Sequence, residues 1–525
     1  MVAIPENDAT VKIIIRLIIA LTGLVVLILL FYAEEDWRGW RAWQKFKREW
    51  EAKGEKFDFV SVVPPTVPDD QNFALTPIVF TSYGSMLTRD GNFIPYDKRD
   101  NYFVDRLKMS VAYNSDWPVT HGNGDWQTAK MSDLKVWQNY YRALVAKKNE
   151  FPVSSQPQTP ARDVLLALSK YDSTIEELRE ASRLPYSRFP LDYNVEDPAE
   201  ILLPHLAALK QCAQVLQLRA IAELQNGQNE KALDDVKLSF RLADSIHTEP
   251  FLISHVDRIA ILNLTLQPIY EGLAEHKWSD AQLVILDLEL SKLDFLADYK
   301  LAMHGEMGTK YGVVHYLQRH PGIYLSLLGD ASNYGHMSAA EFMVATAMHW
   351  HLVPSGWFYQ NQLRCARAFE AYYLPLADVN RQMLVPALIL RANATVEKER
   401  ENLTPFKIFE CLALPVLGNV AEKFAYARSS TDLARIGIAL ERCRLAHGEF
   451  PESLDALAPH FMEKIPHDII NGQPLHYRRT DDGQFVLYSV GWNETDDGGV
   501  IVMVKGSSPG IVSSEGDWVW RYPGK

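Results

Sequence analysis

The feature that most constrains this 525-residue chain is an apolar run near its N-terminus, residues 11–32. The run reads VKIIIRLIIALTGLVVLILLFY, which is about the twenty residues that a helix needs to cross the hydrocarbon core of a bilayer. Its charged residues, Lys12 and Arg16, lie in the first turns, where long basic side chains reach the headgroups. A cleaved signal peptide is the alternative, but the best cleavage position, after Ala33, has Phe31 where a small residue is expected. The run therefore predicts an uncleaved transmembrane anchor behind a short tail, residues 1–10.

The juxtamembrane segment, residues 33–58, predicts a helix with an aromatic stripe. At spacings of three and four it carries Trp37, Trp40, Trp43, Phe46 and Trp50. Side chains at these spacings share one face of a helix, and tryptophan favours the membrane-water interface. Two interpretations stay open: the rings pack on the body of the protein, or they lie at the interface together with the basic residues of the same helix, Arg38, Arg41, Lys45, Lys47 and Arg48.

Composition bounds the rest of the chain. A hydrophobic content of 47% in 525 residues suffices for at least one substantial core. The net charge of -13 argues against a nucleic-acid partner, because a phosphate backbone is held by clustered positive charge. The four cysteines are far apart and form no CxxC pair, so we expect buried thiols at Cys212, Cys365, Cys411 and Cys443.

Two segments of different character follow the juxtamembrane helix. Residues 59–158 contain several prolines and lack periodicity, which predicts an irregular linker or wrapping segment. Residues 159–428 predict a helical domain, in which a long helix ends at Gly227 and a second begins near Glu230. The stretch AELQNGQNEKALDDVKLSFRLAD resembles a tetratricopeptide repeat hairpin. Because no second copy occurs at a fixed period, we expect a helical bundle rather than a solenoid.

The pattern changes again over residues 429–525. A Ser-Ser-Thr sequence at 429–431 predicts the cap of a helix that ends at Gly448. Strands are expected at 474–479 and 485–490, around an Asp-Asp-Gly turn, with a third at 500–505. The fold class expected for the whole chain is mainly α: an N-terminal transmembrane helix, a central all-α helical bundle, and a small α+β C-terminal domain with one helix on an antiparallel sheet.

The C-terminal sequences ALERCRLAHGEFPESLDAL, IPHDIINGQPLHYR and LYSVGWNETDDGG occur in an order that resembles the soluble domain of the type II secretion major pseudopilin. The whole chain resembles bacterial single-pass membrane proteins of uncharacterised activity that carry this module. In the pseudopilin family the last loop binds calcium, so the resemblance implies a Ca²⁺ site at Asn493, Asp496, Asp497 and Asp517. Asn493 stands where an acidic ligand is implied. The alternative is an acidic turn that caps strand ends through Asx hydrogen bonds.

The chain also departs from that family. No Phe-Thr-Leu-Ile-Glu sequence follows a glycine, as it does in the motif that the prepilin peptidase cleaves, so we do not expect assembly into a pilus fibre. The basic residues after the apolar run predict a cytoplasmic body by the positive-inside rule. The resemblance implies the opposite side, where calcium is plentiful. We favour a single-pass inner-membrane protein with a periplasmic body.

Histidines and carboxylates come together in sequence at three places, and none has the spacing of a metal or acid-base site. Pro250 interrupts the first set, and the other two pairs point to different faces of a helix. The three sets are His247, Glu249, His255 and Asp257; His304 and Glu306; and His349 and His351. No Gly-rich phosphate loop and no GxSxG sequence occur either. The sequence therefore predicts no catalytic residue and no cofactor site.

Two functions are compatible with these observations. The first is a membrane-tethered interaction or scaffold protein of the bacterial cell envelope, with the lipid bilayer and an unidentified protein as partners, linked to a secretion or pilus-like system. The second is an envelope hydrolase or transferase with its site in the helical domain, in a groove near the Pro-Ser-Gly-Trp sequence at 354–357. Buried titratable groups in a cleft would favour the enzyme, and an open apolar groove would favour binding.

Overall fold

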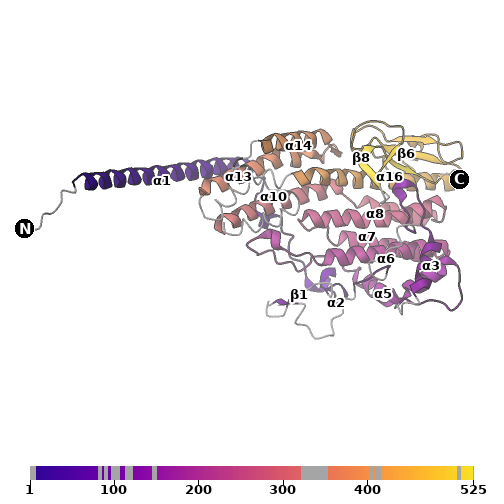
Figure 1. The fold of residues 1–525 in the computed structure, drawn as a ribbon. Coiled ribbons are helices and arrows are strands. Elements are labelled where there is room, and N and C mark those ends of the chain that lie inside the picture. Colours follow the sequence, from indigo (N-terminus) through magenta and orange to yellow (C-terminus); the bar gives the residue numbers. More distant parts are fainter. Residues whose placement is uncertain are drawn as a thin grey trace, which may run out of the picture.

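The apolar run lies inside one long helix, α1 (Asp8–Glu51), which continues past the run without a break (Figure 1). The structure is a computed structural model that describes residues 8–80, 85–87, 93–95, 107–112, 122–144, 151–320, 353–401, 404, 407, 415–504 and 510–523. Within these ranges α1 is the one helix long and apolar enough to cross a membrane, and none of its most apolar stretch is buried. The prediction of an N-terminal helix with the length and apolar composition of a membrane span is therefore confirmed.

The body of the protein is a bundle of helices, as the mainly α fold class predicts. In chain order they are α4 (Pro160–Leu168), α5 (Asp172–Ala181), α6 (His205–Gln225), α7 (Asn229–Asp244), α8 (Leu252–Ala274), α9 (Asp280–Ser291), α10 (Phe295–Arg319), α13 (Ser355–Ala368), α14 (Pro386–Glu401) and α16 (Pro415–His447). A π-helical turn, η12 (Phe369–Tyr373), follows α13. Their buried apolar side chains form two large clusters.

The predicted helical hairpin is confirmed in α6 and α7. Gly227 connects them with a φ of 74°, a conformation that glycine adopts without the steric cost of a Cβ atom. The thiols of Cys212, Cys365 and Cys443 are buried and form no disulfide, whereas Cys411 lies outside the described residues.

The segment from 59 to 158 contains more helix than its sequence suggested. Besides short 3-10 turns it forms α2 (Pro77–Phe80), a two-stranded antiparallel sheet of β1 (Ser85–Leu87) with β2 (Phe93–Pro95), and α3 (Leu134–Leu144). The expectation of irregular structure missed α3, although Asp133 before it accepts hydrogen bonds from Lys135 N and Val136 N, as an N-cap residue does. Its fully buried Trp137 joins one of the two core clusters.

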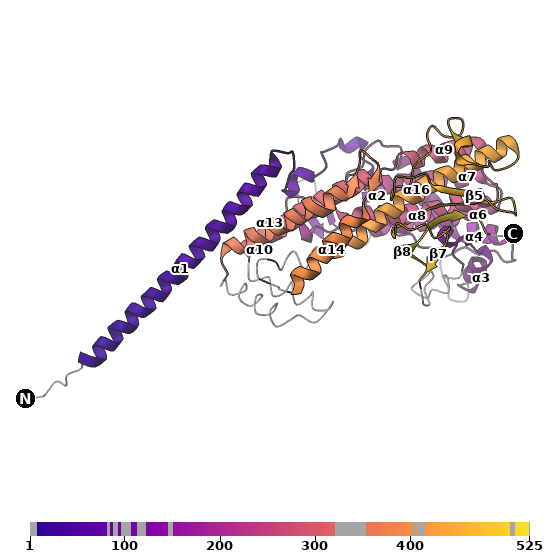
Figure 2. The ribbon, with the colours of Figure 1, turned by 90° about the horizontal axis from the view of Figure 1, so that it is seen from above.

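The C-terminal strands form two small antiparallel sheets at the end of the molecule far from α1 (Figures 1 and 2). The predicted hairpin is present as β5 (His476–Arg479) and β6 (Phe485–Ser489). The expected third strand is present as β7 (Ile501–Met503), but it does not join the hairpin, because it pairs with β8 (Ile511–Gly516) in a separate sheet. The place beside β6 is taken by β9 (Trp518–Arg521), which buries both of its tryptophans.

The expected helix cap at 429–431 is also wrong. Helix α16 runs straight through these residues, which are buried in its middle. The Thr431 hydroxyl donates to the Ala427 carbonyl at 2.8 Å, a bond that satisfies a buried threonine inside a helix. One side of α16 packs on α8 and α9 and another on β9, so the bundle and the sheet share a single core cluster.

Helix α1 meets the body at α13, against which it packs (Figure 1). A methyl group on Gly39 would lie 2.2 Å from the Gly356 carbonyl oxygen, and one on Gly356 would lie 2.0 Å from the Glu35 carbonyl oxygen. The Gly356 amide donates to Asp36 Oδ1 at 2.7 Å, and the Trp357 indole donates to Glu35 Oε2 at 2.9 Å. We call these five residues the anchor seat. The two backbones can approach this closely because neither glycine has a side chain.

The aromatic stripe of α1 divides between two environments. Trp43 and Phe46 are 2% and 9% exposed and pack into the body, where the Trp43 ring stacks on Tyr311 at a centroid distance of 5.7 Å. Trp37 and Trp40 are 56% and 49% exposed. Packing on the body is therefore confirmed for Trp43 and Phe46, while an interfacial position stays a prediction for Trp37 and Trp40.

Replacing Gly39 by leucine should destabilise the protein by about 1–3 kcal/mol, because the added side chain overpacks the seat. Gly23→Leu is the matched control, since nothing lies within 4 Å of a Cβ at that position of the same helix. Leucine has a higher helix propensity than glycine at both positions. A loss of stability that occurs only in Gly39→Leu therefore reports the close contact between Gly39 and Gly356. Thermal unfolding of the full chain in detergent measures the difference, and equal melting temperatures for the two variants would contradict the seat.

Candidate functional site

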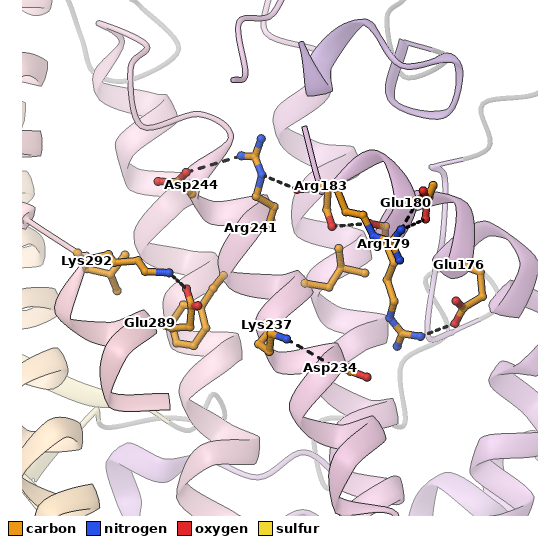
Figure 3. A pocket seen from close by; sticks show the side chains of 14 residues that line it. Glu176, Arg179, Glu180, Arg183, Asp234, Lys237, Arg241, Asp244, Glu289 and Lys292 are labelled. Atoms are coloured by element: carbon orange, nitrogen blue, oxygen red, sulfur yellow. Dashed lines mark hydrogen bonds and ion pairs between the residues drawn. The ribbon is translucent and has the colours of Figure 1, made fainter. Parts of the chain in front are cut away.

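A hollow with a charged rim lies between α5, α7 and α9, with a cavity volume of about 610 Å³. Figure 3 shows its charged side chains gathered around one depression. The lining residues, which we call the charged groove, are Glu176, Arg179, Glu180, Ser182, Arg183, Asp234, Lys237, Leu238, Phe240, Arg241, Asp244, Glu289, Lys292 and Leu293.

Each labelled charge of the groove has a neighbour of opposite sign one helical turn away (Figure 3). The pairs are Glu176 with Arg179, Glu180 with Arg183 (2.8 Å), Asp234 with Lys237 (3.7 Å), Asp244 with Arg241 (3.6 Å) and Glu289 with Lys292 (2.8 Å). Exposed ion pairs of this kind contribute roughly 0–1 kcal/mol each to stability. A bound molecule can therefore replace one partner of a pair at a small cost in free energy. The groove can therefore recognise alternating charge without a net charge of its own.

The groove has an apolar floor and one fixed cation. Leu238, Phe240 and Leu293 are buried beneath the charges. The Arg241 guanidinium donates to the carbonyls of Ser182 (3.2 Å) and Leu184 (3.0 Å), which holds the end of α5 against α7. Burial lowers the pKa of Arg241, and Asp244 opposes that shift. Arg241 is thus part of the framework, whereas the more exposed Arg183 and Lys237 are available to a ligand.

A buried ionic network lies beside the groove and shares Arg179 with it. Arg179 reaches from Glu176 to Asp235, which is fully buried, and Arg219 binds the same carboxylate at 2.9 Å. Arg219 also contacts Glu223 at 3.3 Å, and one Glu223 oxygen is buried with no hydrogen-bond partner. Burial, followed by the charge of Asp235, raises the pKa of Glu223 to about 8. Asp235, Arg219 and Glu223 lie in the core and do not line the cavity.

The first histidine set is dispersed among separate partners. His247 lies beside Asp244, and Asp257 pairs with Lys210 at 2.7 Å. Glu249, in the connection between α7 and α8, binds His205 of α6 at 2.8 Å. Burial, followed by the charge of Arg258, lowers the pKa of His255 to about 3, so this imidazole is neutral. Its Nε2 atom hydrogen-bonds to the Glu249 carbonyl at 2.8 Å. Glu249, His255 and Asp257 thus fasten segments of the core, whereas His247 is exposed.

The other two histidine sets are simpler. His304 contacts Glu55 at 3.1 Å, and Glu306 pairs with Lys310 at 2.8 Å, so the two residues do not meet. His349 and His351 lie outside the described residues. The groove expected around 354–357 is replaced by the anchor seat, where Gly356 is buried against α1.

The residues implied as calcium ligands do come together, but their oxygens hold the loop itself. Asp517 Oδ2 accepts the amides of Gly499 (2.6 Å) and Val500 (3.2 Å), and Oδ1 accepts the Asp497 amide (3.2 Å). Asn493 Nδ2 donates to Asp497 Oδ2 at 3.0 Å. Burial raises the pKa of Asp517, and the three amides oppose that shift. This pattern is the one that the Asx-turn alternative describes, and calcium binding stays a prediction of the resemblance.

Asp496, the remaining implied ligand, is held by its own loop and by strand β6. Its Oδ1 accepts the Gly498 amide at 2.9 Å and the Tyr488 hydroxyl at 3.1 Å. The Gly498 amide is the main reason why the pKa of Asp496 is lowered. Among the residues with described positions, no three histidine, cysteine, aspartate or glutamate side chains are grouped so that they could hold a metal ion.

Sequence reasoning missed the charged groove altogether. Its opposite charges three residues apart, such as Glu180 with Arg183 and Asp234 with Lys237, also occur on ordinary solvated helices. Only the packing of α5, α7 and α9 around a hollow distinguishes these charges from others.

No family model, no curated protein and no solved structure matches the chain.

The pKa of Glu223 predicts a pH dependence of stability. The folded chain binds a proton there more tightly than the unfolded chain, so this group stabilises the fold fully below about pH 4.5 and progressively less as the pH rises to about 8. Glu223→Gln should therefore flatten the decline in stability between pH 5 and 8, with a gain of roughly 2–4 kcal/mol at pH 8. Chemical denaturation across this range, with exposed Glu275→Gln as the control, measures the effect. If stability declined with pH as steeply in Glu223→Gln as in the wild type, the raised pKa of Glu223 would be contradicted.

Proposed function

We propose that this chain is a membrane-tethered interaction or scaffold protein of the bacterial cell envelope, with the charged groove as its binding surface for a protein partner. The observation that carries the proposal is the groove, which combines an apolar floor with weakly paired charges of both signs. Interfaces between proteins share this composition of an apolar centre and a polar rim.

The position of the buried titratable groups supports binding over catalysis. Glu223, Asp235, His205 and Glu249 are buried among helices and do not line the hollow that a substrate would enter. The groove is more polar than the open apolar groove that we associated with binding. Its titratable side chains are mostly exposed and ion-paired, whereas catalytic groups have pKa values shifted by burial in a cleft.

The anchor seat supports the scaffold part of the proposal. Because α1 enters the body as one continuous helix and is fixed by Gly39, Gly356 and the hydrogen bonds of Glu35 and Asp36, the groove has a defined position relative to the span. A rigid connection between the span and the body is what a protein needs in order to hold a partner at a fixed place relative to the bilayer.

A photo-crosslinking amino acid in place of Lys237 tests the groove. We expect a discrete crosslinked product in cells from this position and none from Lys464, an exposed lysine of the C-terminal module. Reversing the neighbouring charge with Arg183→Glu should reduce the crosslink severalfold while the melting temperature stays unchanged, since Arg183 is exposed. A crosslink that is equal at both positions, or insensitive to Arg183→Glu, would remove the groove as the binding surface.

The resemblance of the C-terminal module to secretion pseudopilins supports a periplasmic body and a role beside a secretion or pilus-like system. Alkaline phosphatase fused after Lys525 should then be active in intact cells, because it folds only outside the cytoplasm. A reporter that is active only in the cytoplasm should give no signal when it is fused at the same position. The reverse result would place the body in the cytoplasm and remove the secretion link, while leaving the groove open to a cytoplasmic partner.

A further inference from the structure

The part of α1 beyond the apolar run has two faces. One face, with Glu35, Gly39, Trp43 and Phe46, is buried against the body. The opposite face carries exposed aromatic and basic side chains: Trp37, Trp40, Arg41, Lys45 and Arg48. We call these five residues the outer face of α1. Because it continues from the apolar span in the same helix, its first residues emerge at the level of the lipid headgroups.

Arg41 is the cation of this face that is best placed to bind a lipid phosphate. Arg38, beside it, is already compensated by Glu34 at 3.4 Å and by Glu35. The Arg41 guanidinium lies 5.0 Å from the centre of the Trp37 ring, and no carboxylate in the described part of the chain pairs with it. A guanidinium held over an exposed indole keeps its hydrogen-bond donors free for phosphate oxygens.

Distance along the helix decides which residues can reach the headgroups. With a rise of about 1.5 Å per residue, the Cα atoms of Trp37, Arg41 and Lys45 lie about 7, 13 and 19 Å beyond Tyr32. The headgroup layer is roughly 5–8 Å thick. Helical side chains tilt toward the helix N-terminus, which here is toward the bilayer, so Arg41 can extend down into this layer. Lys45 and Arg48 start too far away.

We propose that Trp37, Trp40 and Arg41 form a binding site for an acidic phospholipid headgroup on the body side of the membrane. The indole rings lie in the interfacial layer and Arg41 binds the phosphate, as tryptophan and arginine do at membrane surfaces. This inference rests on the proposed membrane anchoring and adds to it a lipid class and the residues that select it.

The test uses the full chain reconstituted in phosphatidylcholine vesicles with a trace of spin-labelled lipid. The ratio of association constants for phosphatidylglycerol over phosphatidylcholine is obtained from the motionally restricted component of the electron spin resonance spectrum. We expect the wild-type ratio to exceed that of Arg41→Gln by about three- to fivefold at low ionic strength. The difference should largely disappear at about 1 M salt, where charges are screened.

Lys45→Gln and Arg48→Gln are the matched controls, because they remove the same charge from the same face beyond reach of the headgroups. Both should keep the wild-type ratio. The proposal is overturned if Arg41→Gln keeps it too, or if either control lowers it as much as Arg41→Gln does. Flotation with the vesicles after an alkaline wash tests anchoring separately: a chain that is washed off contradicts the membrane anchor itself, whereas an inserted chain without lipid preference contradicts only the headgroup site.

Discussion

The structure depends most on α16, a helix that is buried on several sides at once. Ala421, Phe424 and Leu433 belong to the same apolar cluster as side chains of α8 and of the C-terminal sheet. A helix with apolar residues around most of its circumference is stable only when it is surrounded. The bundle and the sheet therefore need each other: each covers a side of α16 that would otherwise face water. This shared core also explains why serine and threonine at 429–431 continue the helix instead of starting it.

Several features could be predicted from sequence because their signals are local. The apolar run, the α6–α7 hairpin with Gly227 and the β5–β6 hairpin with Gly483 each depend on residues within one or two neighbouring elements. The anchor seat could not be predicted this way. Gly39 and Gly356 belong to distant parts of the chain, and nothing near either residue indicates the other. The groove was missed for the same reason, since its lining comes from three helices and its charges follow a common surface pattern.

The ionic side chains serve two different purposes, which burial distinguishes. Breaking a buried pair such as Arg219 with Asp235 leaves an uncompensated charge in the core, so this network fixes how α5, α6 and α7 pack. The pairs of the charged groove cost little to rearrange. Arg179 belongs to both sets, because it contacts Glu176 in the groove and Asp235 in the core. A partner that draws Arg179 away from Glu176 would still leave the inner contact in place.

Within the proposed membrane anchoring, the unbroken course of α1 couples the tilt of the apolar span to the body. A helix of 44 residues is about 66 Å long, and a span tilts when the hydrocarbon layer is thinner than its apolar length. Because the seat transmits that tilt to the body, a change of about ten degrees would displace the far end of the helix by roughly 10 Å. Membrane thickness would then help to set the inclination of the body relative to the bilayer and its sideways position over it.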